Sequence, residues 1–295
     1  MINKKIFICL ILLTNMIDGL RQVFSNNTRS LELLYLINDI KPAVRLDANG
    51  IELKKIKGFC NENSLYLEVS DFKAIKTADE GKGSYSNIVR RVPIDYSGDG
   101  LYHTYLSKDK NKAKFLKLLE SKNDDKAVGQ ILGYPECCIG FFIKNKEKQQ
   151  KIQNDYILPI LSNSDGFKFP FYNNYAARYF DVTLLSHFPH SFHCEESIKI
   201  AKNNLECIKK YSEELANKFE AMLKSAVLYT ESNGVFMFRD YKLKNNILQF
   251  NEVKSTINNE LLNLLNKNKK IEIIDKNKIK INGEEIEGVG FMLFS

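Results

Sequence analysis

The chain lacks the features that mark several specialised classes of protein. Its longest apolar run falls short of the roughly 20 residues that cross a bilayer as a helix. Six cysteines in 295 residues are too sparse for a small secreted domain held together by disulfides. The net charge of +7 comes from lysines interleaved with acids, so there is no strong nucleic-acid signature. We therefore expect a cytoplasmic globular protein without a transmembrane segment, and its partners stay unknown.

Common nucleotide-binding and hydrolytic motifs are also absent. The sequence contains no P-loop, GxGxxG, GxSxG or HExxH pattern. What remains is a small set of cysteines and histidines, which points to a metal or thiol site.

The N-terminus carries one feature that disagrees with a cytoplasmic location. Two lysines precede the apolar run 6–13, as in the first part of a signal peptide. No small-residue cleavage pattern follows, and the apolar stripe continues at helical spacing as far as Phe24. We expect a buried N-terminal helix. The alternative is an exported protein in which residues 1–17 act as a signal peptide.

Apolar periodicity indicates an α+β protein with three regions. Residues 1–108 read as a mixed α/β region, and residues 109–226 read as a helical domain that carries the Cys/His metal site. Residues 227–295 read as a small, strand-rich α+β unit. A length of 295 residues leaves ample room for a buried core in about two domains.

The same patterns predict individual elements. Helices are expected over 30–40, 115–119, 176–185 and 258–265, and either one long helix or two helices with a break over 198–222. Strands are expected over 65–69, 101–106, 226–230, 235–238, 271–274, 278–281 and 290–294. Residues 79–86 are polar and contain glycine and serine, so we expect an exposed loop there.

Two cysteines stand at a predicted helix start. Asp124 begins one helix, which Gly133 ends, and Pro135 fits the first turn of the next helix. Cys137 and Cys138 would then occupy its third and fourth positions. Unsatisfied backbone N–H groups at a helix N-terminus lower the pKa of a thiol and favour the thiolate.

The histidines form the second half of the pattern. Three of the four histidines, His187, His190 and His193, fall within seven residues, and Cys194 follows at once. Ser191 is expected to be the N-cap of the following helix, which would place Cys194 in its first turn. This segment therefore offers imidazoles and a second thiolate at another helix start.

Thiolate and imidazole together suit zinc or iron better than calcium or magnesium, which prefer oxygen ligands. Zinc is the favoured cofactor, and iron or an iron–sulfur cluster is the alternative. The preferred ligands are Cys138, His187, His190 and Cys194, with Cys137 and His193 as alternates. The competing interpretation is that the cysteines are buried packing residues and the histidines belong to a loop that caps a helix.

Other side chains are weaker candidates. Glu136 and Glu195 adjoin the predicted ligands, so each is a candidate general base or orienting group, although either carboxylate also simply favours a helix N-terminus. Arg178 is a candidate for holding a substrate. His103, in a predicted strand, is expected to be structural. The remaining cysteines are expected to be packing residues: Cys9, Cys60 and Cys207.

These residues resemble a known family. The stretch Leu-Gly-Tyr-Pro-Glu-Cys-Cys at 132–138, followed by His-x-Pro-His-Ser-x-x-Cys at 187–194, resembles an uncharacterised, mainly archaeal family, domain of unknown function 483. The second motif of that family usually reads His-x-Pro-Cys-Ser-x-x-Cys, so His190 stands where the family has cysteine. This difference weakens an all-thiolate iron–sulfur interpretation and leaves a mixed His/Cys zinc or iron site.

Three functions follow as hypotheses. A metal-dependent enzyme is favoured, because the candidate ligands outnumber the four that a closed site needs. One alternative is a structural metal module in an RNA-binding or RNA-modification protein. The other is a thiol or iron–sulfur redox protein. The family resemblance implies no particular activity.

Overall fold

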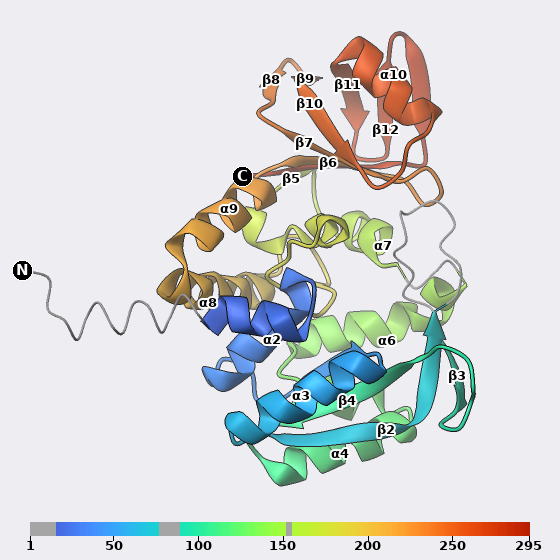
Figure 1. Cartoon of the computed structure of the whole chain (residues 1–295). Helices are drawn as coiled ribbons and strands as arrows, with labels where there is room; N and C mark the ends of the chain where they lie inside the picture. Colours follow the sequence, from blue (N-terminus) through green and yellow to red (C-terminus); the bar gives the residue numbers. More distant parts are fainter. Residues whose placement is uncertain (1–15, 77–88, 152–154) are drawn as a thin grey trace, which may run out of the picture. The chain divides into compact units, whose positions relative to one another are not determined.

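The computed structural model describes residues 16–76, 89–151 and 155–295, which fold as an α+β protein as predicted (Figure 1). The chain separates into two compact units assembled from segments that are distant in the sequence. The first unit takes residues 1–76, 89–143 and 202–217, and the second takes the rest. The division into three consecutive regions stays a prediction. The apolar run 6–13 and the expected loop 79–86 lie outside the described residues.

The first unit contains a four-stranded antiparallel sheet in the order β1-β4-β2-β3. Its strands are β1 (Val44–Ala48), β2 (Tyr66–Lys76), β3 (Val89–Pro93) and β4 (Leu101–Ser107). Its complete helices are α2 (Asn27–Ile37), α3 (Gly50–Glu62), α4 (Lys110–Ser121) and α5 (Asp125–Ile131). Helices α3 and α4 lie on opposite faces of the sheet (Figure 1).

Short polar side chains cap the N-termini of these helices. At α3 the Asn49 side chain accepts from the backbone N–H of Glu52, and the Glu52 carboxylate accepts from the backbone N–H of Asn49. These two reciprocal hydrogen bonds form a capping box. Asp109 caps α4, and Asp124 caps α5 as predicted. Gly133 follows α5 with a φ of +77°, a conformation that glycine adopts without strain.

Helix α6 (Glu136–Gln150) is followed by α7 (Ile157–Ser162) and by a stretch with little regular structure. The helix expected over 176–185 is instead a short 3₁₀ helix, η2 (Tyr175–Phe180), after which Asp181 adopts a φ of +59°. Helix α8 (Glu195–Tyr211) and helix α9 (Glu213–Leu223) divide at Ser212, so the two-helix alternative for 198–222 is the one observed.

Two further sheets complete the second unit. One has the strand order β10-β7-β6-β14-β5 and the other β13-β12-β11-β9-β8. Their strands are β5 (Lys168–Phe169), β6 (Ala226–Tyr229), β7 (Val235–Arg239), β8 (Lys242–Lys244), β9 (Ile247–Gln249), β10 (Glu252–Ser255), β11 (Lys270–Asp275), β12 (Lys278–Ile281), β13 (Glu284–Glu287) and β14 (Gly290–Phe294). A shared apolar core links strands of both sheets with α10 (Glu260–Asn268). The predicted hairpin forms between β6 and β7, with Gly234 at a φ of +92°.

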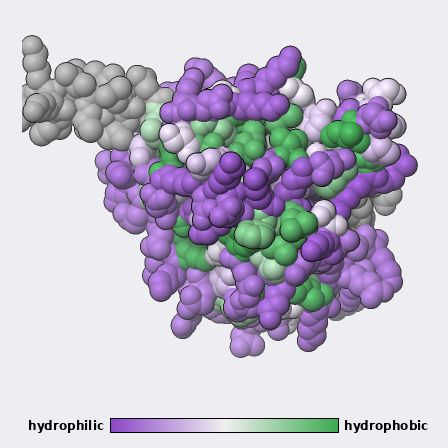
Figure 2. Space-filling model, turned by 90° about the horizontal axis from the view of Figure 1, so that it is seen from below, coloured by the Kyte–Doolittle hydropathy of each residue, from purple (hydrophilic) through white to green (hydrophobic). Residues whose placement is uncertain are grey.

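The face of the molecule drawn in Figure 2 is mostly hydrophilic. Seen from below in Figure 2, apolar residues form separate patches among hydrophilic ones. Phe115 and Leu118 of α4 are among the exposed large apolar side chains, at 55% and 45% exposure. Isolated residues of this kind are ordinary on protein surfaces, so they indicate no partner by themselves. Among the residues described, no helix has the length and apolar content needed to cross a membrane.

Candidate metal centre

Three thiols and an imidazole come together in the folded chain. One ligand atom from each of Cys137, Cys138, His190 and Cys194 lies within 4.8 Å of every other. Sulfur and imidazole nitrogen are the atoms that bind zinc and iron in proteins. The two predicted half-sites therefore converge on a group that could hold a metal ion.

The start of α6 positions the two adjacent cysteines. The carbonyl of Pro135 accepts from the backbone N–H of Cys138 and of Ile139, each at 2.9 Å, which opens the first helical turn. The Sγ atoms of Cys137 and Cys138 lie 3.8 Å apart. Cys138 is a buried residue, whereas Cys137 is an exposed one.

Buried polar side chains hold the other half of the cluster. Asn173 is fully buried, and its side-chain amide donates to the carbonyls of Phe192 and Cys194 at 3.0 and 3.2 Å. The amide of Asn163 donates to the carbonyl of His190 at 2.7 Å. These bonds satisfy carbonyls in a segment without regular structure, and they fix its path.

Cys194 stands immediately before α8 and not within it. Its N–H donates to Ser191 O, and its own carbonyl accepts from Ile198 N, each at 3.0 Å. Cys194 is thus the N-cap of α8, whereas Ser191 was the predicted cap. The helix begins three residues later than that pattern indicated, but the thiol still adjoins the helix N-terminus.

His187 lies outside the cluster and is linked to it through a serine. Its Nε2 lies 2.9 Å from the Ser197 hydroxyl, and this hydroxyl donates to Cys194 Sγ at 3.3 Å. All three side chains are buried. The Ser197 hydroxyl thus connects the His187 imidazole to the Cys194 sulfur.

The other predicted residues occupy different surroundings. His193 is exposed, and its ring packs edge-on against Phe169 at 5.1 Å. Glu136 is exposed and accepts from Gln130, and Glu195 is exposed in the first turn of α8. None of these three belongs to the cluster.

Arg178 lies in η2 among aromatic rings. Its guanidinium donates to the Tyr175 hydroxyl and lies 4.5 Å from the centroid of that ring and 5.6 Å from the centroid of Phe188. Burial lowers its pKa to about 9. Such a setting favours cation–π contact, and a role in holding a substrate stays a prediction.

The remaining described cysteines are buried thiols. Burial raises the pKa of Cys60 to about 12 and that of Cys207 to about 11. Both therefore stay protonated and unreactive at neutral pH, as the packing role expected from the sequence requires. They provide matched controls for the cluster cysteines.

A second group of charged side chains surrounds His103 in the first unit. Its Nε2 lies 3.4 Å from Asp47 and its Nδ1 lies 3.5 Å from Glu120. Both oxygens of Glu120 also accept from Arg45 at 3.0 Å. Burial opposes ionisation of Glu120, but Arg45 and His103 outweigh it and lower its pKa to about 2. The sequence predicted a structural His103 but gave no sign of these partners.

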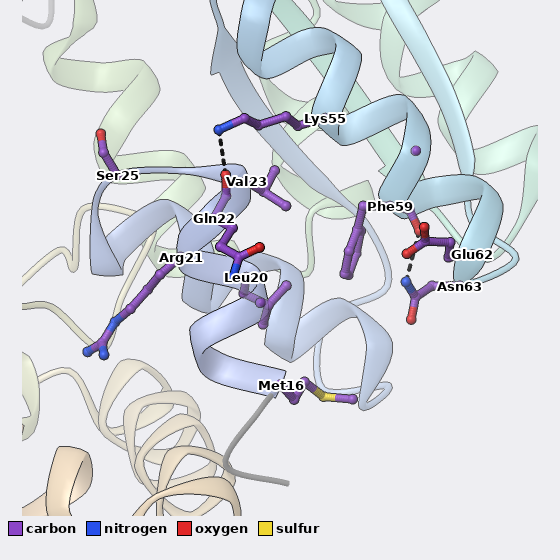
Figure 3. A pocket seen from close by; sticks show the side chains of 12 residues that line it. Met16, Leu20, Arg21, Gln22, Val23, Ser25, Lys55, Phe59, Glu62 and Asn63 are labelled. Carbon is purple, nitrogen blue, oxygen red and sulfur yellow. Dashed lines mark hydrogen bonds between the residues drawn. The ribbon is translucent and has the colours of Figure 1, made fainter. Parts of the chain in front are cut away.

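The first unit also contains a surface pocket of about 880 Å³ between residues 16–25 and α3 (Figure 3). Lys55 Nζ donates to the carbonyl of Gln22 at its rim at 2.7 Å. The lining mixes apolar and polar side chains: Met16, Leu20, Arg21, Gln22, Val23, Ser25, Lys55, Phe59, Glu62 and Asn63, with Gly19 and Gly58. None of the cluster residues lines it, so the pocket is separate from the thiol chemistry.

Comparison with known proteins supports the family resemblance. The profile of a family described as "Protein of unknown function (DUF483)" matches residues 113–224. This stretch runs from α4 to the end of α9 and contains all four cluster residues. No curated protein and no solved structure matches the chain. The match therefore points to an uncharacterised family, while its archaeal distribution and motif pattern stay expectations.

Proposed function

We propose that Cys137, Cys138, His190 and Cys194 together bind a single zinc ion. The observation that supports this most directly is the convergence of their four ligand atoms to within 4.8 Å. A set of three cysteines and one histidine is an established tetrahedral donor set for structural zinc. The same set differs from the ligands first preferred, because Cys137 takes the place of His187.

The sulfur separation favours one ion over a cluster. A Zn–S distance of about 2.3 Å in a tetrahedron puts neighbouring sulfurs about 3.8 Å apart. The Sγ atoms of Cys137 and Cys138 are 3.8 Å apart. In a [4Fe–4S] cluster each thiolate binds a different iron, so an iron–iron edge separates neighbouring thiolates in addition to two iron–sulfur bonds. Sulfurs at the observed spacing therefore suit a mononuclear site better than a four-iron cluster.

Four protein ligands support a structural role for the ion. A tetrahedral ion with four protein ligands keeps no position for an activated water, in contrast to hydrolytic zinc sites with three. Because such ligands converge only in the folded chain, the free energy of metal binding adds to the stability of the fold.

The proposal is tested by elemental analysis of the full chain purified without added metal. We expect one zinc per chain. His190→Ala is expected to lose most of this zinc, whereas His193→Ala, which alters an exposed histidine of the same segment, is expected to retain it. Substitution with Co²⁺ is expected to give the intense visible bands of a tetrahedral thiolate site.

Three results would contradict the proposal. Absence of any stoichiometric metal would remove the metal site. Stoichiometric iron with sulfide would replace zinc by an iron–sulfur cluster. Equal zinc loss from His190→Ala and His193→Ala would show that the cluster is not the binding site.

A further inference from the structure

We propose that the outward face of α4, together with an aromatic residue of β2, binds single-stranded nucleic acid. This α4 surface consists of Tyr66, Lys110, Lys114, Phe115, Leu118 and Lys122. None of these residues belongs to the cysteine cluster, so the inference is independent of the proposed zinc site. It follows from the charge of α4, from its exposed apolar side chains and from the place of Tyr66 on the sheet.

The charge of α4 is one-sided. Residues 110–121 contain four lysines and a single acid, Glu120. Glu120 is buried and both of its oxygens accept from Arg45, so its charge is compensated beneath the helix and not by the lysines. Lys110 and Lys114 are exposed and stand one helical turn apart on the same face. The outward face of α4 is therefore cationic and complements an anionic partner.

Large apolar side chains lie among these lysines. Phe115 and Leu118 are 55% and 45% exposed, and the turns of a helix cover its own backbone, so this exposed area belongs to their side chains. Spacings of three and four residues place Lys114 and Lys122 on the same face of the helix. In Figure 2, which views the molecule from the side on which α4 lies in Figure 1, apolar residues are surrounded by hydrophilic ones.

A second exposed aromatic residue lies on the α4 side of the sheet. Tyr66 opens β2, is 45% exposed and pairs directly with Ser107 of β4. Because strand side chains alternate, Ser107 shares its face with Tyr105, which packs with Leu116 of α4 in one apolar cluster. Directly paired residues lie on one face, so Tyr66 is on this face as well. The chain enters α4 just after Ser107, so Tyr66 is near the start of the helix.

Lysines interspersed with exposed aromatic rings fit a nucleic acid strand. Ammonium groups contact the phosphates, and aromatic rings stack on the bases of any sequence. In a duplex the bases already stack on one another, whereas the bases of a single strand are free to stack on Tyr66 and Phe115. The observed set of side chains therefore favours a single strand over a duplex.

The same face suits a membrane surface less well. A helix that lies in a lipid interface presents a broad apolar stripe, about 100° wide or more. On α4 the lysines at positions 114 and 122 share the outward face with Phe115 and Leu118. This face therefore lacks a continuous apolar stripe.

Fluorescence anisotropy of a labelled oligouridylate tests the proposal with the full chain. A length of about 20 nucleotides exceeds the site of a typical single-strand-binding domain. We expect a Kd of about 1–100 μM at physiological salt. The slope of log affinity against log salt concentration is expected to be about −2, from three lysines that each contribute about −0.7. Duplex RNA of the same length is expected to bind more weakly.

Aromatic variants test the stacking. Phe115→Ala and Tyr66→Ala are each expected to weaken binding about tenfold, through loss of one stacked base. Ile51→Ala, which removes a 70% exposed apolar side chain from α3 on the opposite face of the sheet, is expected to bind like the unaltered chain. Urea unfolding of each variant checks that the fold is retained.

Lysine variants test the charge. The double change Lys110→Gln and Lys114→Gln is expected to bring the salt slope from about −2 to about −1. The double change Lys54→Gln and Lys57→Gln removes the same charge from exposed positions of α3 and is expected to leave the slope unchanged.

A fluorescent variant reports the contact itself. The chain contains no tryptophan, so Phe115→Trp introduces a single indole. We expect this variant to bind oligouridylate like the unaltered chain, with its fluorescence quenched as a base stacks on the ring. Ile51→Trp on α3 is expected to show no quenching.

Four results would overturn the proposal. These are absence of oligouridylate binding, equal affinity for duplex RNA, unchanged affinity of Phe115→Ala or Tyr66→Ala, and an unchanged salt slope after the Lys110 and Lys114 substitutions. Binding to vesicles that contain phosphatidylserine, without binding to oligouridylate, would assign the α4 surface to a membrane instead. Because zinc content is measured separately, each of these results leaves the zinc proposal standing.

Discussion

Two histidines of this chain lie in groups of opposite character. His103 lies between the carboxylates of Asp47 and Glu120, and Arg45 neutralises the second of these. His190 instead lies with three thiols, whose sulfur atoms are electron-pair donors like its own ring nitrogen. The first group contains both signs of charge. The second becomes an anionic set of donors once its thiols lose their protons.

This difference explains why one group is structural and the other is a candidate metal centre. A buried carboxylate is stabilised when a guanidinium and an imidazole face it, so the charge of Glu120 is compensated within its own group. Several thiolates at close range repel one another unless a cation joins them. The comparison predicts that substitutions in the His103 group change stability alone, whereas substitutions in the cysteine cluster change metal content.

The largest effect is expected for Cys138→Ala. Loss of a buried ligand is expected to lower zinc affinity by more than about 100-fold. Substitution of a residue that only hydrogen-bonds to a ligand lowers metal affinity by up to roughly that factor. Competition with a chromogenic chelator measures this affinity. Cys207→Ala, which also removes a buried thiol, is expected to leave zinc affinity unchanged. Equal zinc affinities for Cys138→Ala and Cys207→Ala would contradict the assignment of metal binding to the cysteine cluster.

Glu120→Gln is expected to have the next largest effect, on stability alone. The change leaves Arg45 and His103 facing a neutral amide at a site where the Glu120 side chain is only 8% exposed. We expect the free energy of unfolding to fall by about 2–4 kcal/mol, with zinc content unchanged. Urea unfolding and elemental analysis of the same sample check both parts, and zinc loss would contradict the separation of the two groups.

The stabilising effect of Glu120 is expected to depend on pH. Its pKa lies near 2 in the folded chain, below the ordinary value of 4.5. A lowered folded pKa stabilises the fold above the unfolded pKa and loses this effect as pH falls through the folded pKa. The difference between the unaltered chain and Glu120→Gln should therefore be full above about pH 5 and shrink toward pH 2. A constant difference over this range would argue against an ionised Glu120.

Ser197→Ala tests whether the hydrogen bond to Cys194 tunes the cluster. Removing this donor is expected to lower zinc affinity about 10–100-fold and to shift the sulfur-to-Co²⁺ band to lower energy. Ser121→Ala, which alters an exposed hydroxyl on α4, provides the control. If Ser197→Ala alters neither the zinc affinity nor the energy of the sulfur-to-Co²⁺ band, this hydroxyl does not tune the cluster.

The smallest effect is expected for Arg91→Gln. Arg91 lies 3.7 Å from Glu120 with a side chain that is 38% exposed. Solvent screens such a pair, so the free energy of unfolding should fall by about 1 kcal/mol or less. A loss as large as that of Glu120→Gln would mean that Arg91, and not Arg45, neutralises the buried carboxylate.

Local sequence signals predicted much of the fold. Asp124 and Gly133 marked the ends of α5, and the Asn-Gly pair before Val235 marked the hairpin of β6 and β7. Helix α3 was missed because only Ile56 and Cys60 on it are buried, which leaves a weak apolar period. Its capping box at Asn49 and Glu52 was the signal that would have found it.

The candidate site was predictable in composition but not in detail. The spacing of the cysteines and histidines identified both halves of the cluster. Which histidine joins it depends on a segment without regular structure, whose path is set by bonds from Asn163 and Asn173. The partners of His103 come from β1 and α4, far away in the sequence. Only the folded chain brings such residues together.

X-ray absorption at the zinc edge of the full chain tests the metal centre most directly. We predict three sulfur neighbours at about 2.3 Å and one nitrogen neighbour at about 2.0 Å around a single zinc. A shell of nitrogen and oxygen alone, or a second metal close to the first, would contradict a zinc ion held by Cys137, Cys138, His190 and Cys194.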